Sequence, residues 1–184
     1  MKYMSVLLLL VLGLWQVSGS GYMLAKAHLS QYLIISAWEQ TLEDREPHLP
    51  WDWADTYPIF EMCFPSLDKK SIVLEGASGR NMAFSAAHSS ESGMPGENKS
   101  TIVSGHRDSH FQHLQYLNKG DQIVINSINQ LHTYRVVKIE IVNSKLETLA
   151  IRNTDEIILT TCYPFDAIQT GGNLRFVVYA TPVT

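Results

Sequence analysis

The sequence has few cysteines and no cluster of basic residues. Cys63 and Cys162 are the only two cysteines among 184 residues, too few for the disulfide framework of a small secreted domain. One disulfide between them is an alternative that would leave no free thiol. Lys and Arg number 14 against 18 Asp and Glu, for a formal net charge of -4. Because phosphate recognition needs clustered Lys and Arg, this balance argues against nucleic-acid binding.

Charge is also missing from the N-terminal region. No charged residue lies between Lys2 and Lys26, and residues 3–25 just reach the roughly 20 residues of a membrane-spanning helix. We favour a signal anchor over residues 1–25 that stays in the membrane. The alternative is a signal peptide that is cleaved near the small residues 17–19. In both cases the rest of the chain is exported, and Lys2 favours a cytoplasmic N-terminus.

A helix and a linker are predicted over residues 26–56. Ile34, Trp38 and Leu42 recur at every fourth position, which predicts an amphipathic helix that begins near residue 22 and ends near residue 43. Two prolines, Pro47 and Pro50, then mark an extended linker.

From about residue 57 to residue 184 the sequence changes to short β-type runs that are separated by turn residues. Gly, Asn and Pro cluster between the runs, and only residues 111–117 read as a short helix. Many short strands at this spacing predict a mainly β domain, a barrel or sandwich of about eight strands. The expected strands lie near residues 59–64, 71–76, 81–86, 101–105, 122–127, 132–142, 156–162 and 174–180.

Cys162 is the first candidate for chemistry. It ends the run Leu159-Thr160-Thr161-Cys162, directly before the turn pair Tyr163-Pro164. A thiol at the end of a strand can face an open cleft, whereas a thiol in the middle of a strand is usually part of the core. The alternative for Cys162 is a small buried hydrophobic residue. A reactive thiolate needs positive charge nearby.

His106 and Arg175 are the candidates that could supply that charge. His106 ends a second apolar run, residues 101–105, and Arg175 lies between apolar residues near the C-terminus. Together with Cys162 they form a nucleophile, an acid/base and a cation, which suffice for acyl transfer through a thioester. Taken singly, His106 also fits an ordinary loop histidine, and Arg175 also fits a solvent-facing arginine.

A zinc site is the weaker alternative for the histidines. His106, His110 and His113 follow at spacings of four and three, with His88 upstream. However, His106 ends a predicted strand, and the sequence has no His-Glu-x-x-His motif of a zinc helix. We therefore expect no metal and no cofactor.

These motifs resemble those of the sortases, a family of cysteine transpeptidases, over residues 57–181. The resemblance is carried by Arg175 and by two motifs, Ile102-Val103-Ser104-Gly105-His106-Arg107-Asp108 and Leu159-Thr160-Thr161-Cys162-Tyr163-Pro164-Phe165. The N-terminal part is similar to the membrane-proximal region of the Gram-negative-type (class GN) sortases. Its matching segments are residues 25–29, 37–38, 50–55, 74–80 and 84–88.

The resemblance implies a fold, a location and an activity. It implies an eight-stranded β-barrel, anchored by an N-terminal membrane helix at the outer face of the cytoplasmic membrane. The expected substrate is a secreted protein with a Leu-Pro-X-Thr-Gly-like C-terminal sorting signal, and the acyl acceptor is an amine. The acidic calcium-binding loop of some Gram-positive sortases is not evident, which is a second reason to expect no metal.

The resemblance also implies residue roles. Cys162 would be the nucleophile, His106 the general acid and then the base, and Arg175 the residue that binds substrate or steadies the oxyanion. We predict Thr161, Ser104 and His88 as substrate-binding residues. Two alternatives are a thiol hydrolase that releases its acyl group to water, and a membrane-tethered barrel that only binds peptides.

Overall fold

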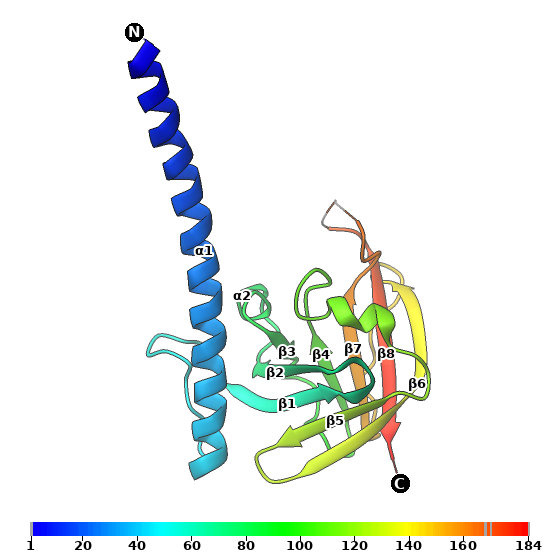
Figure 1. Ribbon diagram of the computed structural model, residues 1–184. Coiled ribbons are helices and arrows are strands. Elements are labelled where there is room, and N and C mark those ends of the chain that lie inside the picture. The colour runs from blue at the N-terminus through cyan, green and yellow to red at the C-terminus, as the bar shows by residue number, and fades with distance from the viewer. Residues whose placement is uncertain (1, 168, 170, 184) are drawn as a thin grey trace.

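Eight strands form one closed barrel beside a long N-terminal helix (Figure 1). This computed structural model describes residues 2–167, 169 and 171–183. The strands follow one another around the barrel in the order β1-β2-β3-β4-β7-β8-β6-β5. Their bounds are β1 Pro58–Phe64, β2 Lys69–Glu75, β3 Ala86–His88, β4 Ser100–Ser104, β5 Gln122–Ser127, β6 Leu131–Asn143, β7 Glu156–Cys162 and β8 Leu174–Pro182.

Alternation along the strands builds the barrel core. In β1 the side chains of Phe60, Met62 and Phe64 are fully buried, while Glu61 and Cys63 between them are half-buried on the outer face. This period of two is what a half-buried strand requires. A second, smaller cluster lies on the outer face of β4, β6, β7 and β8, and its buried members are Ile102, Val142, Ile158, Val177 and Tyr179.

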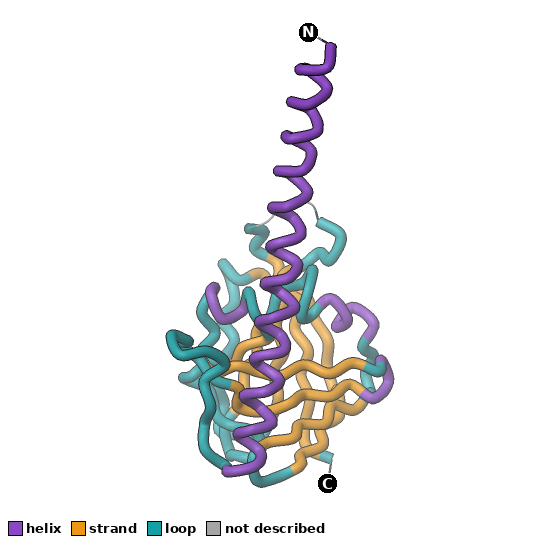
Figure 2. The backbone as a smooth tube through the Cα atoms, turned by 60° about the vertical axis from the view of Figure 1, so that its left-hand side comes forward, coloured by secondary structure: helices purple, strands orange, loops and turns teal. Residues whose placement is uncertain are grey.

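One unbroken helix, α1, covers Lys2–Asp44. Near its C-terminal end it buries Ile34, Ala37, Trp38 and Thr41 and contacts β1 and β2. The predicted amphipathic helix is therefore present, although Leu42 is exposed. The N-terminal half of α1 extends away from the barrel (Figure 2).

Within the part of the chain whose side chains are described, no helix combines the length and the hydropathy needed to cross a membrane.

The predicted linker after α1 folds back along the helix. The ring of Trp51 meets that of Phe84 edge-on with centroids 5.0 Å apart. The hydroxyl of Thr56 donates to the Glu75 carbonyl at 2.7 Å, so the segment is tied to the end of β2. It therefore runs beside α1 and does not separate the helix from the barrel.

Seven of the eight expected strands are confirmed within a few residues, and the strand predicted near residues 81–86 is wrong. A one-turn helix, α2 (Gly79–Met82), occupies most of that segment, and the short β3 follows it. Ser78 caps the helix by accepting from the Asn81 backbone amide at 3.1 Å, as serine commonly does at an N-cap. Two short 3₁₀ turns, η1 (Pro65–Leu67) and η2 (Gln112–Tyr116), complete the fold, and η2 confirms the short helix expected there.

Candidate active site

Cys162 is the last residue of β7, and its direct partner on β8 is Arg175. Side chains that lie opposite each other in an antiparallel pair share one face of the sheet. The thiol and the guanidinium therefore lie on the same face, where each is half-buried. This register supplies the positive neighbour that the sequence predicted for the Cys162 thiol.

His106 follows β4, which runs parallel to β7 with Ser104 opposite Thr160. The pairing continues beyond the strand, because the Gly105 amide donates to the Thr160 carbonyl at 3.2 Å. His106 comes directly after Gly105, so it lies at the same end of the barrel as Cys162, which follows Thr160 by two residues. His106 is exposed, so the imidazole is open to solvent and to a substrate.

Gly105 allows the chain after β4 to pass close to the core. A Cβ atom at this position would lie 2.9 Å from Cγ of Phe111, which is fully buried. The Phe111 amide also donates to the His106 carbonyl at 2.9 Å. The glycine and this backbone bond fix the loop that presents His106.

Thr161 points to the opposite face from Cys162 and is buried. Its hydroxyl donates to the Gly105 carbonyl at 2.7 Å, which joins the ends of β4 and β7. The predicted substrate-binding role is not supported by this position, because the side chain faces the interior. Ser104 is half-buried at the end of β4, two residues before His106, a position that is compatible with its predicted role.

His88, also predicted to bind substrate, is only 3% exposed. One ring nitrogen, Nδ1, lies 2.9 Å from the Glu75 carboxylate. The other, Nε2, lies 2.9 Å from the Ser92 hydroxyl and 3.0 Å from the Gly93 carbonyl. Because both nitrogens already have protein partners, His88 has no free polar atom for a substrate. This position does not favour the predicted role, because His88 joins β2, β3 and the loop after β3.

Arg175 contacts its own loop through one nitrogen. Nη1 donates to the carbonyls of Gly172 at 2.6 Å and Leu174 at 2.9 Å. A guanidinium carries five N–H donors, so donors remain for a substrate carbonyl or a developing oxyanion. The backbone bonds hold the side chain at the mouth of the β7–β8 loop.

Arg107 has a structural role that the sequence did not reveal. Only 8% of it is exposed, and its Nη2 donates to the carbonyls of Ala167 at 2.8 Å and Gln169 at 2.7 Å. A buried charge of this kind needs such partners. Arg107 therefore connects the loop that carries His106 to the loop that follows Cys162. The adjacent His-Arg pair was visible, but its partners lie about sixty positions downstream.

Both cysteines are free, so the disulfide alternative does not apply. Cys63 is half-buried on β1 with its Sγ 3.6 Å from Oε2 of Glu61. Burial raises the pKa of the Cys63 thiol, and the Glu61 carboxylate raises it further. The Cys63 thiolate is therefore disfavoured.

The histidines considered for zinc are spread over different surroundings. The ring of His113 packs edge-on against Phe64 with centroids 4.5 Å apart. Burial, with a smaller effect of Lys69, lowers the pKa of His113 to about 4. Across the described residues, no three His, Cys, Asp or Glu side chains gather as metal ligands would.

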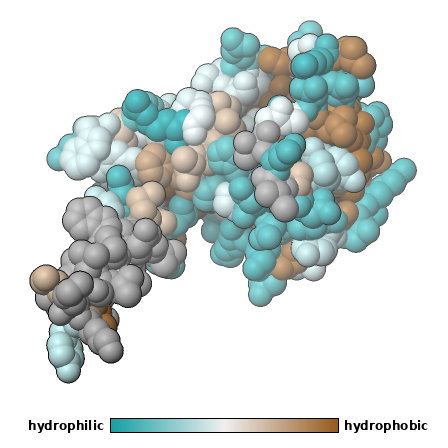
Figure 3. Space-filling model, turned by 90° about the horizontal axis from the view of Figure 1, so that it is seen from above, coloured by the Kyte–Doolittle hydropathy of each residue, from teal (hydrophilic) through white to brown (hydrophobic). Residues whose placement is uncertain are grey.

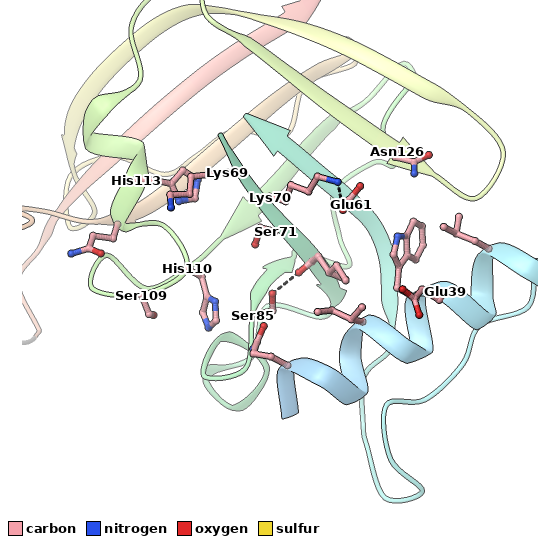
Figure 4. A pocket seen from close by; sticks show the side chains of 16 residues that line it. Glu39, Glu61, Lys69, Lys70, Ser71, Ser85, Ser109, His110, His113 and Asn126 are labelled. Atoms are coloured by element: carbon pink, nitrogen blue, oxygen red, sulfur yellow. Dashed lines mark hydrogen bonds and ion pairs between the residues drawn. The ribbon is translucent and has the colours of Figure 1, made fainter. Parts of the chain in front are cut away.

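Two hollows differ in their relation to Cys162. A cleft of about 620 Å³ lies between α1, the β1–β2 hairpin and the segment that follows His106. Its lining includes Glu61, Lys70 and His110 but none of the three candidate residues (Figure 4). A hollow of about 460 Å³ adjoins the end of β7. Its lining includes Tyr163, Phe165 and Phe176, whose rings pack with centroids 5.2 to 6.4 Å apart.

A family model of the sortase domain matches residues 62–183. The chain belongs to the sortase family. The matched stretch contains Cys162, His106 and Arg175. The family and its eight-stranded barrel thus agree with the expectation from the sequence, whereas the narrower class GN assignment is not established.

Individual relatives agree with the family. The chain is 33% identical over 123 residues to Sortase D of Bacillus subtilis (strain 168), over 65% of this chain and 61% of the relative. It therefore spans about three fifths of that relative.

Solved structures show the same fold. Sortase C1 from Streptococcus agalactiae is 27% identical with a TM-score of 0.61, over 69% of this chain and 68% of that one. A Clostridium perfringens Sortase D5 transpeptidase is 19% identical with a TM-score of 0.63, over 79% and 89% of the two chains.

Proposed function

We propose that this sortase is a cysteine transpeptidase that cleaves a peptide bond through an acyl-enzyme thioester and transfers the acyl group to an amine. The observation that carries the proposal is the register of three neighbouring strands. It brings Cys162 at the end of β7, Arg175 on β8 and His106 after β4 to one end of the barrel. A structural cysteine would need neither neighbour.

The proposed chemistry uses each residue once per half-reaction. The Cys162 thiolate attacks the scissile carbonyl, and the free donors of Arg175 stabilise the negative oxygen of the tetrahedral intermediate. His106 donates a proton to the departing amine, which leaves a thioester on Cys162. The incoming amine then attacks the thioester, and neutral His106 accepts its proton as the thiolate departs.

The proposed substrate is a Leu-Pro-X-Thr-Gly-like sorting signal near the C-terminus of a secreted protein. The hollow lined by Tyr163, Phe165 and Phe176 supports a partly apolar peptide, because aromatic faces bind apolar side chains well. Tyr163, which lines the hollow, directly follows Cys162 in the chain. The hollow is therefore close enough to receive a side chain next to the scissile bond.

We also propose that residues 3–25 anchor the enzyme in the cytoplasmic membrane with the barrel outside the cytoplasm. The support is the absence of charge between Lys2 and Lys26 and the backbone of α1, which is helical through this segment. The membrane-proximal motifs at residues 25–29 and 50–55 support a class GN-type sortase in a Gram-negative envelope.

Release of the acyl group to water is the second candidate. His106 is exposed, so water can reach the proposed thioester as easily as an amine can. The test incubates the full-length enzyme with a sorting-signal peptide, with and without a small amine. An amine-dependent conjugate supports transpeptidation, whereas equal hydrolysis under both conditions identifies a hydrolase. If a panel of such peptides gives neither cleavage nor an acyl-enzyme, both enzymatic functions are excluded, and the alternative of a barrel that only binds peptides remains.

A further inference from the structure

The N-terminal half of α1 and the catalytic end of the barrel point in the same direction. In Figure 1 the N-terminus and the β7–β8 loop both extend upward, whereas the C-terminus and the β5–β6 hairpin lie at the other end. Figure 2 shows the same arrangement after rotation. The orientation is fixed by packing, because Ile34, Ala37 and Trp38 of α1 are buried. Cys162 therefore lies toward whatever surrounds the N-terminal half of α1.

Two tyrosines of this half of α1 are separated by about the thickness of a bilayer. Tyr3 is 91% exposed and Tyr22 is 66% exposed. They are 19 positions apart, about 29 Å along a helix at 1.5 Å per residue. The hydrocarbon layer of a bilayer is about 30 Å thick, with tyrosine and tryptophan concentrated at both of its boundaries. The outer boundary would then lie near Tyr22.

Just beyond that level, the folded-back linker and α1 form a surface with an apolar centre and basic edges. A hollow of about 430 Å³ lies there, and the juxtamembrane patch is defined here as four of its lining residues, Lys26, Leu29, Trp53 and Arg80. Trp53 is 83% exposed and Leu29 is 56% exposed. Seen from above, the molecule exposes both hydrophobic and hydrophilic residues (Figure 3).

The patch combines the two chemistries that headgroups attract. An exposed tryptophan buries its ring at the boundary between acyl chains and headgroups, and lysine and arginine attract anionic lipid phosphates. Arg80 pairs with Asp55 at 3.0 Å in an exposed position, where such a pair is weak and leaves other guanidinium donors. A protein partner would have to share this level of α1 with the bilayer, so the lipid surface is the occupant that fits.

We propose that the juxtamembrane patch lies on the outer headgroup layer and holds the barrel with Cys162 facing the bilayer. This inference rests on the proposed anchor over residues 3–25. The barrel is then held to the membrane at two places, by α1 and by the juxtamembrane patch, and the patch limits the tilt of the barrel. The enzyme cleaves sorting signals close to the point where they leave the membrane.

The test uses the full-length chain in phospholipid vesicles that contain anionic lipid. Single cysteines replace Asp52, exposed beside the patch, Asp166 of the β7–β8 loop, or Asn129 of the β5–β6 hairpin, in a Cys63→Ala, Cys162→Ala background. Each carries an environment-sensitive fluorophore, and nitroxide-headgroup lipid is the quencher. We expect quenching at positions 52 and 166 to exceed that at position 129 severalfold. Equal quenching at all three positions would overturn the proposal.

Two further measurements separate this outcome from failure of the anchor. Flotation reports whether the chain stays with the vesicles: a chain that floats but shows equal quenching keeps its anchor and loses the proposed orientation. In the chain labelled at position 166, Trp53→Asp should reduce quenching, and Leu131→Asp, an exposed apolar residue of β6 at the far end, should not. Unchanged quenching in Trp53→Asp would show that the patch does not contact the membrane.

Discussion

The two cysteines occupy similar depths in the barrel but differ in their charged neighbours. Both are half-buried and both lie on the outer face of a strand. Each has a cation as its cross-strand partner, Arg175 for Cys162 and Lys70 for Cys63. Cys63 also has the Glu61 carboxylate 3.6 Å from its sulfur, and this carboxylate pairs with Lys70. Since the thiolate is the reactive form, burial and the Glu61 carboxylate together disfavour it at Cys63.

Strand position adds to the difference. Cys63 lies inside β1, which is paired on one side with β2 and on the other with β5. Cys162 is the final residue of β7, where the chain turns away. A peptide can reach a strand end, whereas a residue that is flanked by two paired strands can be reached only from the face of the sheet. Each prediction below removes one of these differences.

The largest effect is expected for removal of the thiol itself. Cys162→Ala should lower acyl transfer by a factor on the order of 10³ or more, because the covalent path is lost. Cys63→Ala should leave most of the activity, with at most a small packing loss. The measurement is conjugate formation from a sorting-signal peptide and an amine, with circular dichroism as the folding control. Full activity of Cys162→Ala would end the transpeptidase proposal.

Removal of the imidazole should have the next largest effect. His106→Ala should reduce transfer by about 10²- to 10⁴-fold, the range for loss of a general acid and base. The coupled Cys162–His106 pair should give a bell-shaped pH dependence in the wild type, whose limbs belong to the pair. A bell that survives unchanged in His106→Ala would exclude His106. The matched control is His110→Ala, in the same loop.

Replacement of Arg175 by another cation tests whether the geometry of its hydrogen-bond donors matters. Arg175→Lys keeps the positive charge opposite Cys162 but loses the planar fork of donors. We expect a loss of about 10²-fold, comparable to removal of an oxyanion donor, without a new limb in the pH profile. A rate equal to that of the wild type would show that charge alone suffices at this position.

The sequence offered candidates for the chemistry but not the contacts that hold them in place. Cys162, His106 and Arg175 each end or begin an apolar run, and such strand ends are visible in a one-dimensional pattern. The residues that hold them are not. Arg107 meets carbonyls about sixty residues away, and Thr161 meets one 56 residues away. No local pattern encodes either contact.

The same limit explains the errors in the fold. A strand is expected over residues 81–86, yet the Ser78 cap and the Asn81 side chain, which donates to the Glu75 and Gly76 carbonyls, fix a helical turn. His88 lies at a strand end like His106, but its neighbours Glu75 and Ser92 occupy it. Tertiary partners decided both cases.

A smaller effect is expected where the contact with the site is indirect. The Ala167 and Gln169 carbonyls both accept from the same Arg107 nitrogen, Nη2. Arg107→Lys replaces it with an ammonium on a shorter side chain that is more strongly hydrated. The β7–β8 loop should then be held less firmly, and we expect about a tenfold rise in KM with a smaller fall in kcat, as for lost substrate positioning. Arg152→Lys, exposed on the β6–β7 loop, is the control. A kcat loss as large as that of Arg175→Lys would place Arg107 in the chemistry itself.

The smallest effect is expected from a change in the surroundings of the inert thiol. Burial is the first cause of the raised pKa of Cys63, and the Glu61 carboxylate is the second. Glu61→Gln removes the negative charge, so the pKa of Cys63 should fall and the thiolate fraction at a fixed pH below it should rise. Alkylation of Cys63 by iodoacetamide should become severalfold faster in the folded protein, while that of Cys162 stays unchanged. Mass spectrometry of the two peptides separates the rates. If the alkylation rate of Cys63 does not change, burial alone protects this thiol. The effect of a neighbouring charge on thiol reactivity would then apply only to Cys162.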